Sequence, residues 1–178
     1  MATVTEEITD GTSSHVEVNV ELLHAVVGSV KSAMMMCDMK VRCVGVSRVP
    51  ARDTGNITGM IGVHGKVSGF LTVNLAERFA ICAVEGLLQE EYGKLTSQVI
   101  DGAGEITNII TGGVKSTLAK TRWGFSHITV PSTIVGRDFS IAYTRGLEFL
   151  DVMFEHDDPE AFRLEDRMMH VSMSLLTL

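Results

Sequence analysis

The sequence predicts a single α+β domain in two layers, with a six-stranded, mostly antiparallel sheet that carries its helices on one face. Three observations lead to this class. Helical and extended patterns alternate along the chain, a helix followed by three β-rich runs occurs twice, and the helices that open these two units match at a constant offset of 84 residues. Two equivalent triplets of strands pair most simply as one sheet, which helices with one apolar face can cover.

Composition excludes several classes of protein. The chain has 178 residues, 45% hydrophobic and 21% charged, as is typical of one globular domain. The formal net charge is −7 and no block of lysine and arginine occurs, so we expect no nucleic-acid partner. No apolar run approaches the roughly 20 residues of a membrane span, so we expect no membrane partner. We predict a mobile polar leader at 1–15 and one domain at 16–178.

The cysteines and histidines show no metal-binding pattern. Cys37, Cys43 and Cys82 are not spaced as CxxC and lie among apolar neighbours. This is typical of buried, reduced thiols in a cytoplasmic protein, and a cytoplasmic location is our prediction. The six histidines form no HExxH motif, so zinc is not expected. Four methionines at 34–39 are expected to fill gaps in a core or an interface, or else to form an adaptable partner surface.

Periodicity assigns each element in order. Apolar residues at helical spacing predict helices at 16–37, 77–89 and 95–120. Extended patterns predict strands at 41–49, in a 57–75 hairpin that turns at His64-Gly65-Lys66, at 125–130 before Pro131, at 147–156 and at 168–177. The charged segment 157–167 is expected to be a solvated loop.

The long helix at 95–120 has two faces of different character. Its apolar stripe is wide enough to face a core: Val99, Ala103, Ile106, Ile110, Val114 and Leu118. The opposite face aligns Asp101, Glu105, Asn108 and Gly112 at spacings of four, three and four. Each interior glycine costs roughly 1 kcal/mol relative to alanine, and here Gly113 follows Gly112. Such a departure from local rules indicates either a function or close packing. Small residues beside Glu105 and Asn108 would let another surface approach them.

The first helix repeats features of the long one. Gly28, Lys31 and Ser32 coincide with Gly112, Lys115 and Ser116, and Glu21 falls opposite Glu105. This predicts a duplicated helix–strand–strand–strand unit, with 77–89 inserted and a pseudo-twofold axis relating the copies. His24 replaces the asparagine in the first copy. Its neighbours Leu22 and Leu23 favour packing there, so we expect an inactive first copy.

In this order of segments the chain resembles the CheC/CheX/FliY family of chemotaxis phosphatases, and most of all the CheX branch. The family carries Asp/Ser-x3-Glu-x2-Asn on a long helix, and Asp101, Glu105 and Asn108 match it without a gap. Residues 57–69, 108–113 and 128–136 resemble the family's glycine-punctuated hairpin, its Asn-x-x-x-Gly continuation and its Pro-Thr-x-x-x-Gly stretch. The resemblance spans about residues 16–178. A single Glu-x-x-Asn motif is typical of the CheX branch.

The resemblance implies a hydrolase that removes the aspartyl phosphate from a CheY-like response regulator in chemotaxis or related two-component signalling. Glu105 would pair with a lysine of the regulator, and Asn108 would orient the attacking water. Asp101 would support docking, and Gly112 and Gly113 would give clearance. The chain itself would bind no cofactor, since the regulator supplies Mg²⁺. The family also implies a homodimer joined through sheet edges, for which we expect 139–144 or 168–177.

Two other readings stay open at this point. The chain could be a non-catalytic docking module that binds a regulator, although the intact Glu105 and Asn108 pair favours the enzyme. A motor-switch or scaffold component like the FliY branch is a more distant alternative. The sequence does not decide whether Glu21 and His24 retain any function.

Overall fold

The structure is a computed structural model that describes residues 2–6, 14–50, 55–136, 141 and 146–177. Its seven-stranded antiparallel sheet has the order β3-β8-β9-β5-β4-β6, and β7 also pairs with β4. The bounds of its strands are β3 Val41–Ser47, β4 Ile57–Gly65, β5 Val67–Leu75, β6 Phe125–Ile128, β7 Ser132–Val135, β8 Glu148–His156 and β9 Met168–Thr177.

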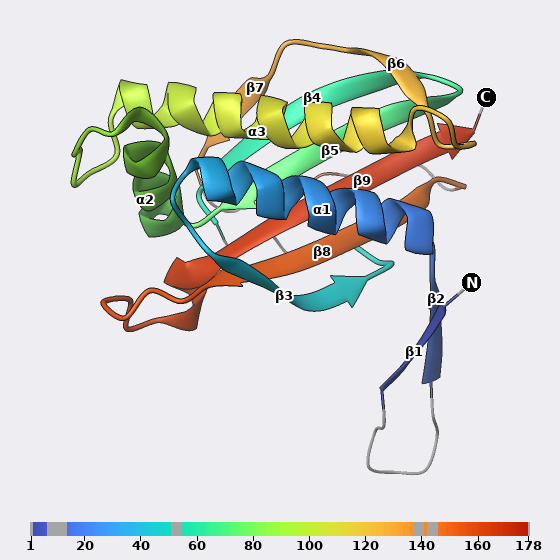
Figure 1. The fold of residues 1–178 in the computed structure, drawn as a ribbon, viewed down its shortest axis with the longest axis horizontal. Coiled ribbons are helices and arrows are strands. Elements are labelled where there is room, and N and C mark those ends of the chain that lie inside the picture. The colour runs from blue at the N-terminus through green and yellow to red at the C-terminus, as the bar shows by residue number, and fades with distance from the viewer. Residues whose placement is uncertain (1, 7–13, 51–54, 137–140, 142–145, 178) are drawn as a thin grey trace.

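Three helices cover one face of this sheet (Figure 1): α1 Val20–Met36, α2 Glu77–Leu88 and α3 Ser97–Leu118. A short 3-10 helix, Leu164–Arg167, precedes β9. α3 packs on β4 and α1 packs on β8, and the two helices run side by side in opposite directions (Figure 1). The predicted two-layer α+β class is therefore confirmed. The core lies between the layers, where one side of every central strand is apolar.

The predicted number of six strands is wrong by one: the expected strand at 125–130 is β6, and β7 at 132–135, after Pro131, was not predicted. β6 pairs with the second half of β4, and β7 pairs with the first half. Pro131 lies between them and has no N–H to donate to a ladder. The break is held to β4 instead by Thr129, whose N–H donates to the Gly62 carbonyl and whose Oγ1 accepts from the Gly62 N–H, both at 2.9 Å.

Residues 168–177 were predicted as an exposed edge, and this is also wrong. β9 pairs with β5 on one side and with β8 on the other, so it lies at the centre of the sheet. The edges are β3 at one end and β6 with β7 at the other. The second predicted edge, 139–144, falls outside the described residues except for Ile141.

The beginning of the chain contains a separate two-stranded sheet. β1 Ala2–Glu6 pairs with β2 Ser14–Val18, and the pair stands away from the main sheet (Figure 1). The first helix consequently begins at Val20 and not at 16. Asn19 caps it, since its side-chain oxygen accepts from the Leu22 N–H at 3.2 Å. The mobility of the 1–15 leader stays a prediction.

The charged segment 157–167 was expected to be a solvated loop, but it is partly anchored. Asp158 is 8% exposed, and its carboxylate accepts from the Arg78 guanidinium of α2 at 2.5 Å. That hydrogen bond lowers the pKa of Asp158 below its ordinary value. The side chain of Phe162, farther along the segment, is fully exposed. The sequence indicated the polar character of this segment but not its ion pair with α2.

The three cysteines differ in exposure, although all were predicted to be buried. Cys37 is buried and Cys82 is half-buried, but Cys43 lies exposed on the edge strand β3. Burial raises the pKa of the Cys37 thiol to about 11 and also raises the pKa of Cys82. The sequence misled here because an edge strand exposes residues that an inner strand of equal hydropathy would bury.

This difference in exposure predicts that one of the three thiols reacts much faster than the others with a thiol reagent. At pH 8 a disulfide reagent such as Ellman's is expected to react with Cys43 far faster than with Cys37, because only the thiolate attacks and Cys37 is both protonated and covered. Stopped-flow absorbance should show one fast phase and two slow ones, and Cys43→Ser should remove the fast phase. A fast phase that survives in Cys43→Ser would contradict the assignment.

Candidate functional site

α3 is a well-formed platform for the predicted site. The side chain of Thr96 caps the helix by accepting from the Val99 N–H at 3.3 Å. All six residues of the predicted apolar stripe are at most 1% exposed. The helix also lies unusually close to the sheet at Gly59, where a Cβ atom would overlap Thr107. The backbone of the residue next to Asn108 is therefore fixed against β4.

The opposite side of α3 presents the predicted polar residues. Asp101 and Glu105 are exposed, and Asn108 and Gly112 are half-buried. Within the described part of the chain, no hydrogen bond or ion pair is formed by the side chains of Asp101, Glu105 or Asn108. Their polar atoms are therefore free to bind groups of a second molecule.

The other polar side chains of this helix behave differently. Four hydroxyls donate to the backbone carbonyl four residues earlier, at 2.7–3.0 Å: those of Thr107, Thr111, Ser116 and Thr117. Asn108 could have bonded to the backbone in a similar way, as asparagine often does. Its carboxamide stays unengaged instead, one turn from Glu105. These hydroxyls bond to the helix itself, whereas the Asn108 carboxamide has no partner among the described residues.

The glycines of α3 divide into two groups. At Gly102 a Cβ atom would lie 2.6 Å from Val84 of α2, and at Gly113 it would lie 2.8 Å from Ser29 of α1. Their small size allows close packing between helices of the same domain. At Gly112 nothing lies within 4 Å. Gly112 is therefore the glycine of this pair that leaves space on the outward face.

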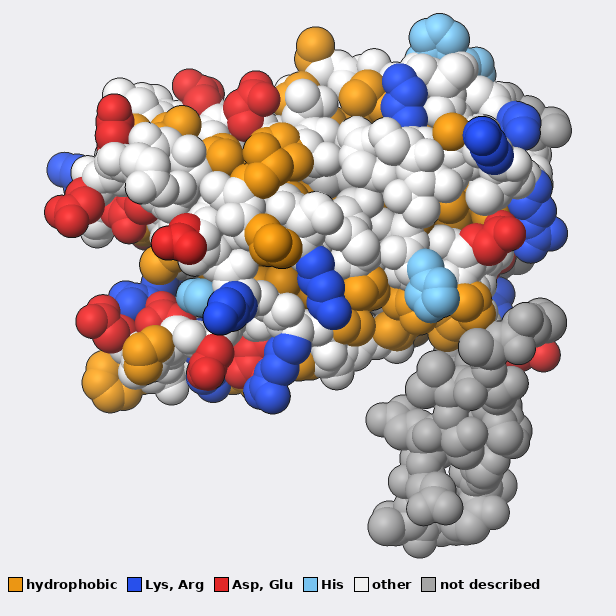
Figure 2. Space-filling view, viewed as in Figure 1, with side chains coloured by type: hydrophobic (Ala, Val, Ile, Leu, Met, Phe, Trp, Pro, Cys, Tyr) orange, Lys and Arg blue, Asp and Glu red, His pale blue; other side chains and the backbone are white. Residues whose placement is uncertain are grey.

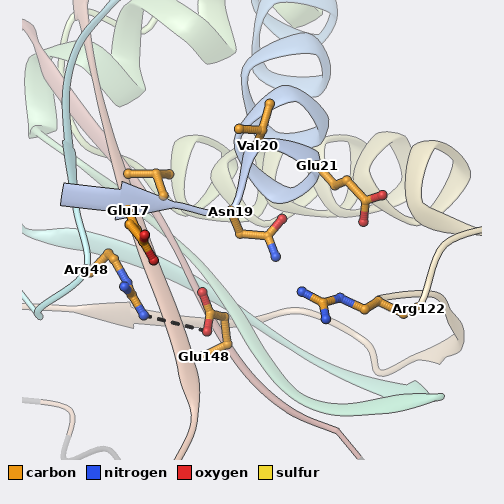
Figure 3. Close-up of a pocket in the computed structure, with 8 residues that line it drawn as sticks. Glu17, Asn19, Val20, Glu21, Arg48, Arg122 and Glu148 are labelled. Carbon is orange, nitrogen blue, oxygen red and sulfur yellow. Dashed lines mark ion pairs between the residues drawn. The ribbon is translucent and has the colours of Figure 1, made fainter. Parts of the chain in front are cut away.

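Glu21 and His24, the expected counterparts of Glu105 and Asn108, lie on the outward side of α1, and both are exposed. The predicted packing of His24 is wrong, because Leu22 turns into the core and leaves His24 outside. A cavity of about 570 Å³ lies at this end of α1 (Figure 3). Its polar lining includes Glu17, Asn19, Glu21, Arg48, Arg122 and Glu148.

Arginines distinguish this cavity from the outward face of α3. Arg122 points into it (Figure 3) and also stacks on Trp123, with 4.7 Å between its guanidinium carbon and the ring centroid. Arg48 pairs with Glu148 at 3.8 Å. Sequence reasoning missed these arginines, because they lie outside the repeated helix and only the fold brings them to Glu21. Glu21 thus shares its surroundings with cations of the same chain.

Among the described residues, no three or more His, Cys, Asp or Glu side chains gather closely enough to hold a metal ion. In that same part of the chain, no helix has the length and apolar character needed to cross a membrane.

Solved structures share this fold over most of the chain. CheX from Vibrio vulnificus matches with 21% identity and a TM-score of 0.72, covering 88% of this chain and 99% of that one. CheX from Desulfovibrio desulfuricans gives 19% identity, a TM-score of 0.73 and coverages of 88% and 99%. A CheX–CheY–BeF3–Mg²⁺ complex from Borrelia burgdorferi matches with 21% identity and a TM-score of 0.65. The match covers 88% of this chain and 96% of that one. No curated protein sequence matches the chain.

The sequence itself identifies the family. The profile of the family described as chemotaxis phosphatase CheX matches residues 57–155, which is more than half of the chain. The match begins at β4, includes all of α3, the helix that carries Asp101, Glu105 and Asn108, and ends in β8. This protein therefore belongs to the CheX family of chemotaxis phosphatases.

Proposed function

We propose that this protein hydrolyses the aspartyl phosphate of a CheY-like response regulator, with Glu105 and Asn108 as its functional side chains. The observation that carries the proposal is the unengaged pair on α3. A carboxylate and a carboxamide stand one turn apart on a rigid helix, without partners among the described residues. Family membership and the relative crystallised with CheY, BeF3 and Mg²⁺ support the choice of partner.

The reaction requires positioning and charge neutralisation. Water attacks the phosphorus atom, the bond from phosphorus to the aspartyl oxygen breaks, and the aspartate leaves as a carboxylate. Mg²⁺ bound by the regulator would neutralise the phosphoryl oxygens. Glu105 would pair with a lysine of the regulator and hold α3 against its phosphorylation site. No covalent intermediate forms on this chain.

Asn108 suits the second task because its carboxamide is neutral. It can hold the attacking water with both a donor and an acceptor, and it adds no negative charge beside the phosphoryl group. Asp101 would assist docking one turn before Glu105. Gly112 would leave clearance for the regulator, and Gly113, which packs on Ser29, would keep α1 close behind the site.

We infer further that the domain arose by duplication. The strand order supports this, since β3, β4 and β5 occupy positions that mirror β6/β7, β8 and β9 across the β5–β9 pair. The contact of Gly113 with Ser29 supports it as well, because these residues are counterparts at the offset of 84 and a twofold axis between the helices would bring counterparts together. A homodimer joined through a sheet edge, and a cytoplasmic location, stay predictions.

The proposed function is tested by phosphate release. A purified CheY-like regulator is phosphorylated with a small phosphodonor in Mg²⁺, and its loss of phosphate is followed alone, with wild-type protein and with the double variant Glu105→Ala/Asn108→Ala. We expect acceleration by the wild type only. Binding without acceleration for every co-encoded regulator would favour the docking module and contradict the proposal.

Clearance at Gly112 gives a prediction with a built-in control. Gly112→Ala and its counterpart Gly28→Ala both place a methyl group where nothing lies within 4 Å. Each is expected to raise the free energy of unfolding by up to about 1 kcal/mol through helix propensity, as measured in urea. Only Gly112→Ala should weaken the regulator's binding. Equal turnover in both variants would show that the regulator does not approach Gly112.

A further inference from the structure

The methionines at the end of α1 divide between the core and the surface. Met34 and Met39 are buried, as the core prediction requires, whereas Met35 and Met36 are 76% and 58% exposed. Two adjacent methionines that stay exposed in a folded domain leave a considerable apolar area in water. Methionine is flexible and polarizable, which makes it common on surfaces that adapt to a partner.

These methionines lie beside the proposed catalytic residues. α1 and α3 are antiparallel and meet where Gly113 contacts Ser29. Met35 follows Ser29 by six residues and Asn108 precedes Gly113 by five, so both lie about 7–9 Å from the crossing, on the same side. Axes of packed helices are about 8–10 Å apart. The half-buried Ile109 lies next to Asn108 in the chain.

The surface over α1 and α3 carries an apolar area beside acidic side chains. Hydrophobic side chains gather between α3 and the second half of α1, and acidic side chains stand next to them over the first half of α3 (Figure 2). We name the group of Met35, Met36 and Ile109 the apolar ridge. From the helix register we infer that this ridge borders the outward line of Asp101, Glu105 and Asn108.

The usual size of a protein interface favours the regulator as the partner that covers this ridge. A standard interface buries about 800 Å² on each partner, which corresponds to a disc of roughly 16 Å radius. A regulator centred on Asn108 therefore reaches across the neighbouring helix. We propose that the apolar ridge is a second docking element for the regulator, which receives an apolar patch at the rim of the regulator's phosphorylation pocket. This inference rests on the proposed function.

The degenerate first site provides an independent comparison. Because the helices are antiparallel, the site of Glu21 and His24 is bordered by the end of α3. The residues there that correspond to Met35 and Met36 are Ala119 and Lys120. The apolar ridge thus lies on the helix next to the complete Glu-x-x-Asn motif. Next to the site of Glu21 and His24, the corresponding positions hold a small residue and a cation. An apolar patch on the regulator would therefore fit the site of Glu105 and Asn108 but not the site of Glu21 and His24.

The test replaces the sulfur side chains without disturbing the helix. Met35→Gln/Met36→Gln keeps chain length and helix propensity at two exposed positions. The control is Leu176→Thr, which removes an apolar side chain that is 44% exposed on β9 and that alternates with the core residue Leu175. Initial rates of phosphate release are measured over a range of phosphorylated regulator, and self-association of each variant is followed by sedimentation velocity.

The double variant is expected to raise KM for the regulator about tenfold and to leave kcat within about twofold, because the ridge binds but does not touch the reacting atoms. Leu176→Thr should keep wild-type values. If the double variant kept both the wild-type KM and the wild-type kcat, the docking role of the ridge would be wrong, while the proposed phosphatase activity would still stand. A variant that changes only self-association would assign the ridge to a second copy of the chain and would likewise overturn the proposal.

A direct binding measurement separates this inference from the proposed function. If the wild-type protein accelerates phosphate loss from no regulator, the phosphatase proposal fails. Binding of a beryllofluoride-activated regulator then tests whether the ridge is a docking element. Weaker binding of the double variant would support it, and equal binding would overturn it.

Discussion

Asn108→Ala is expected to lower kcat by about 100-fold or more, with KM for the phosphorylated regulator within about threefold of the wild type. Loss of one preorganised hydrogen-bonding group at a reacting centre has an effect of about this size, roughly 2.7 kcal/mol in the transition state. The carboxamide is half-buried and unengaged in the described structure, so its removal leaves the fold without a broken hydrogen bond. The measurement is a full rate profile against regulator concentration.

Two further variants test whether the effect of Asn108→Ala comes from the neutral carboxamide and whether it is specific to α3. Asn108→Asp keeps the shape but adds a negative charge beside the phosphoryl group, and we expect it to be as inactive as Asn108→Ala. His24→Ala changes the residue of α1 that corresponds to Asn108 at the offset of 84, and we expect it to keep the wild-type rate. If His24→Ala were the variant that lost activity, α1 and α3 would have been assigned the wrong roles.

Glu105→Ala is expected to raise KM by at least about 30-fold and to lower kcat as well. Truncating one partner of a buried charge pair typically costs 2–5 kcal/mol, since the other charge stays buried without a partner. Here the charge left behind is the regulator's lysine. Because Glu105 has no cationic partner among the described residues, its whole charge is available for this pairing.

Salt and a counterpart variant test the origin of that effect. The wild-type KM should rise with ionic strength more steeply than that of Glu105→Gln, because salt screens the pairing of opposite charges at a surface. Glu21→Ala should behave like the wild type, since Glu21 stands at the cavity lined by Arg48 and Arg122. Wild-type turnover in both Glu105→Ala and Asn108→Ala would place the site elsewhere.

Local periodicity was sufficient for most of the fold. It predicted all three helices, the β4–β5 hairpin at Lys66 and the apolar stripe of α3, because the spacing of apolar residues reports directly which face an element buries. The spacing of Asp101, Glu105 and Asn108 also fixed their common direction, since a helix leaves that geometry no freedom. The resemblance added the family, which the profile match confirms.

Other features depended on partners that are distant in the sequence. Periodicity does not say which strand lies beside which, so β9 was predicted at an edge although it is central, and Cys43 was predicted to be buried although β3 is an edge. The strand β7 after Pro131, which pairs with β4, and the ion pair of Asp158 with Arg78 likewise depend on long-range contacts.

The sequence by itself thus determined most of the elements, their buried faces and the outward line of Asp101, Glu105 and Asn108 on α3. Only the tertiary structure decided what surrounds that line. The antiparallel packing of α1 on α3, with Gly113 against Ser29, brings the end of α1 that carries Met35 and Met36 to the same side of the helix crossing as Asn108. A one-dimensional pattern holds no information on this proximity, because it arises from the crossing of two helices that are far apart in the chain.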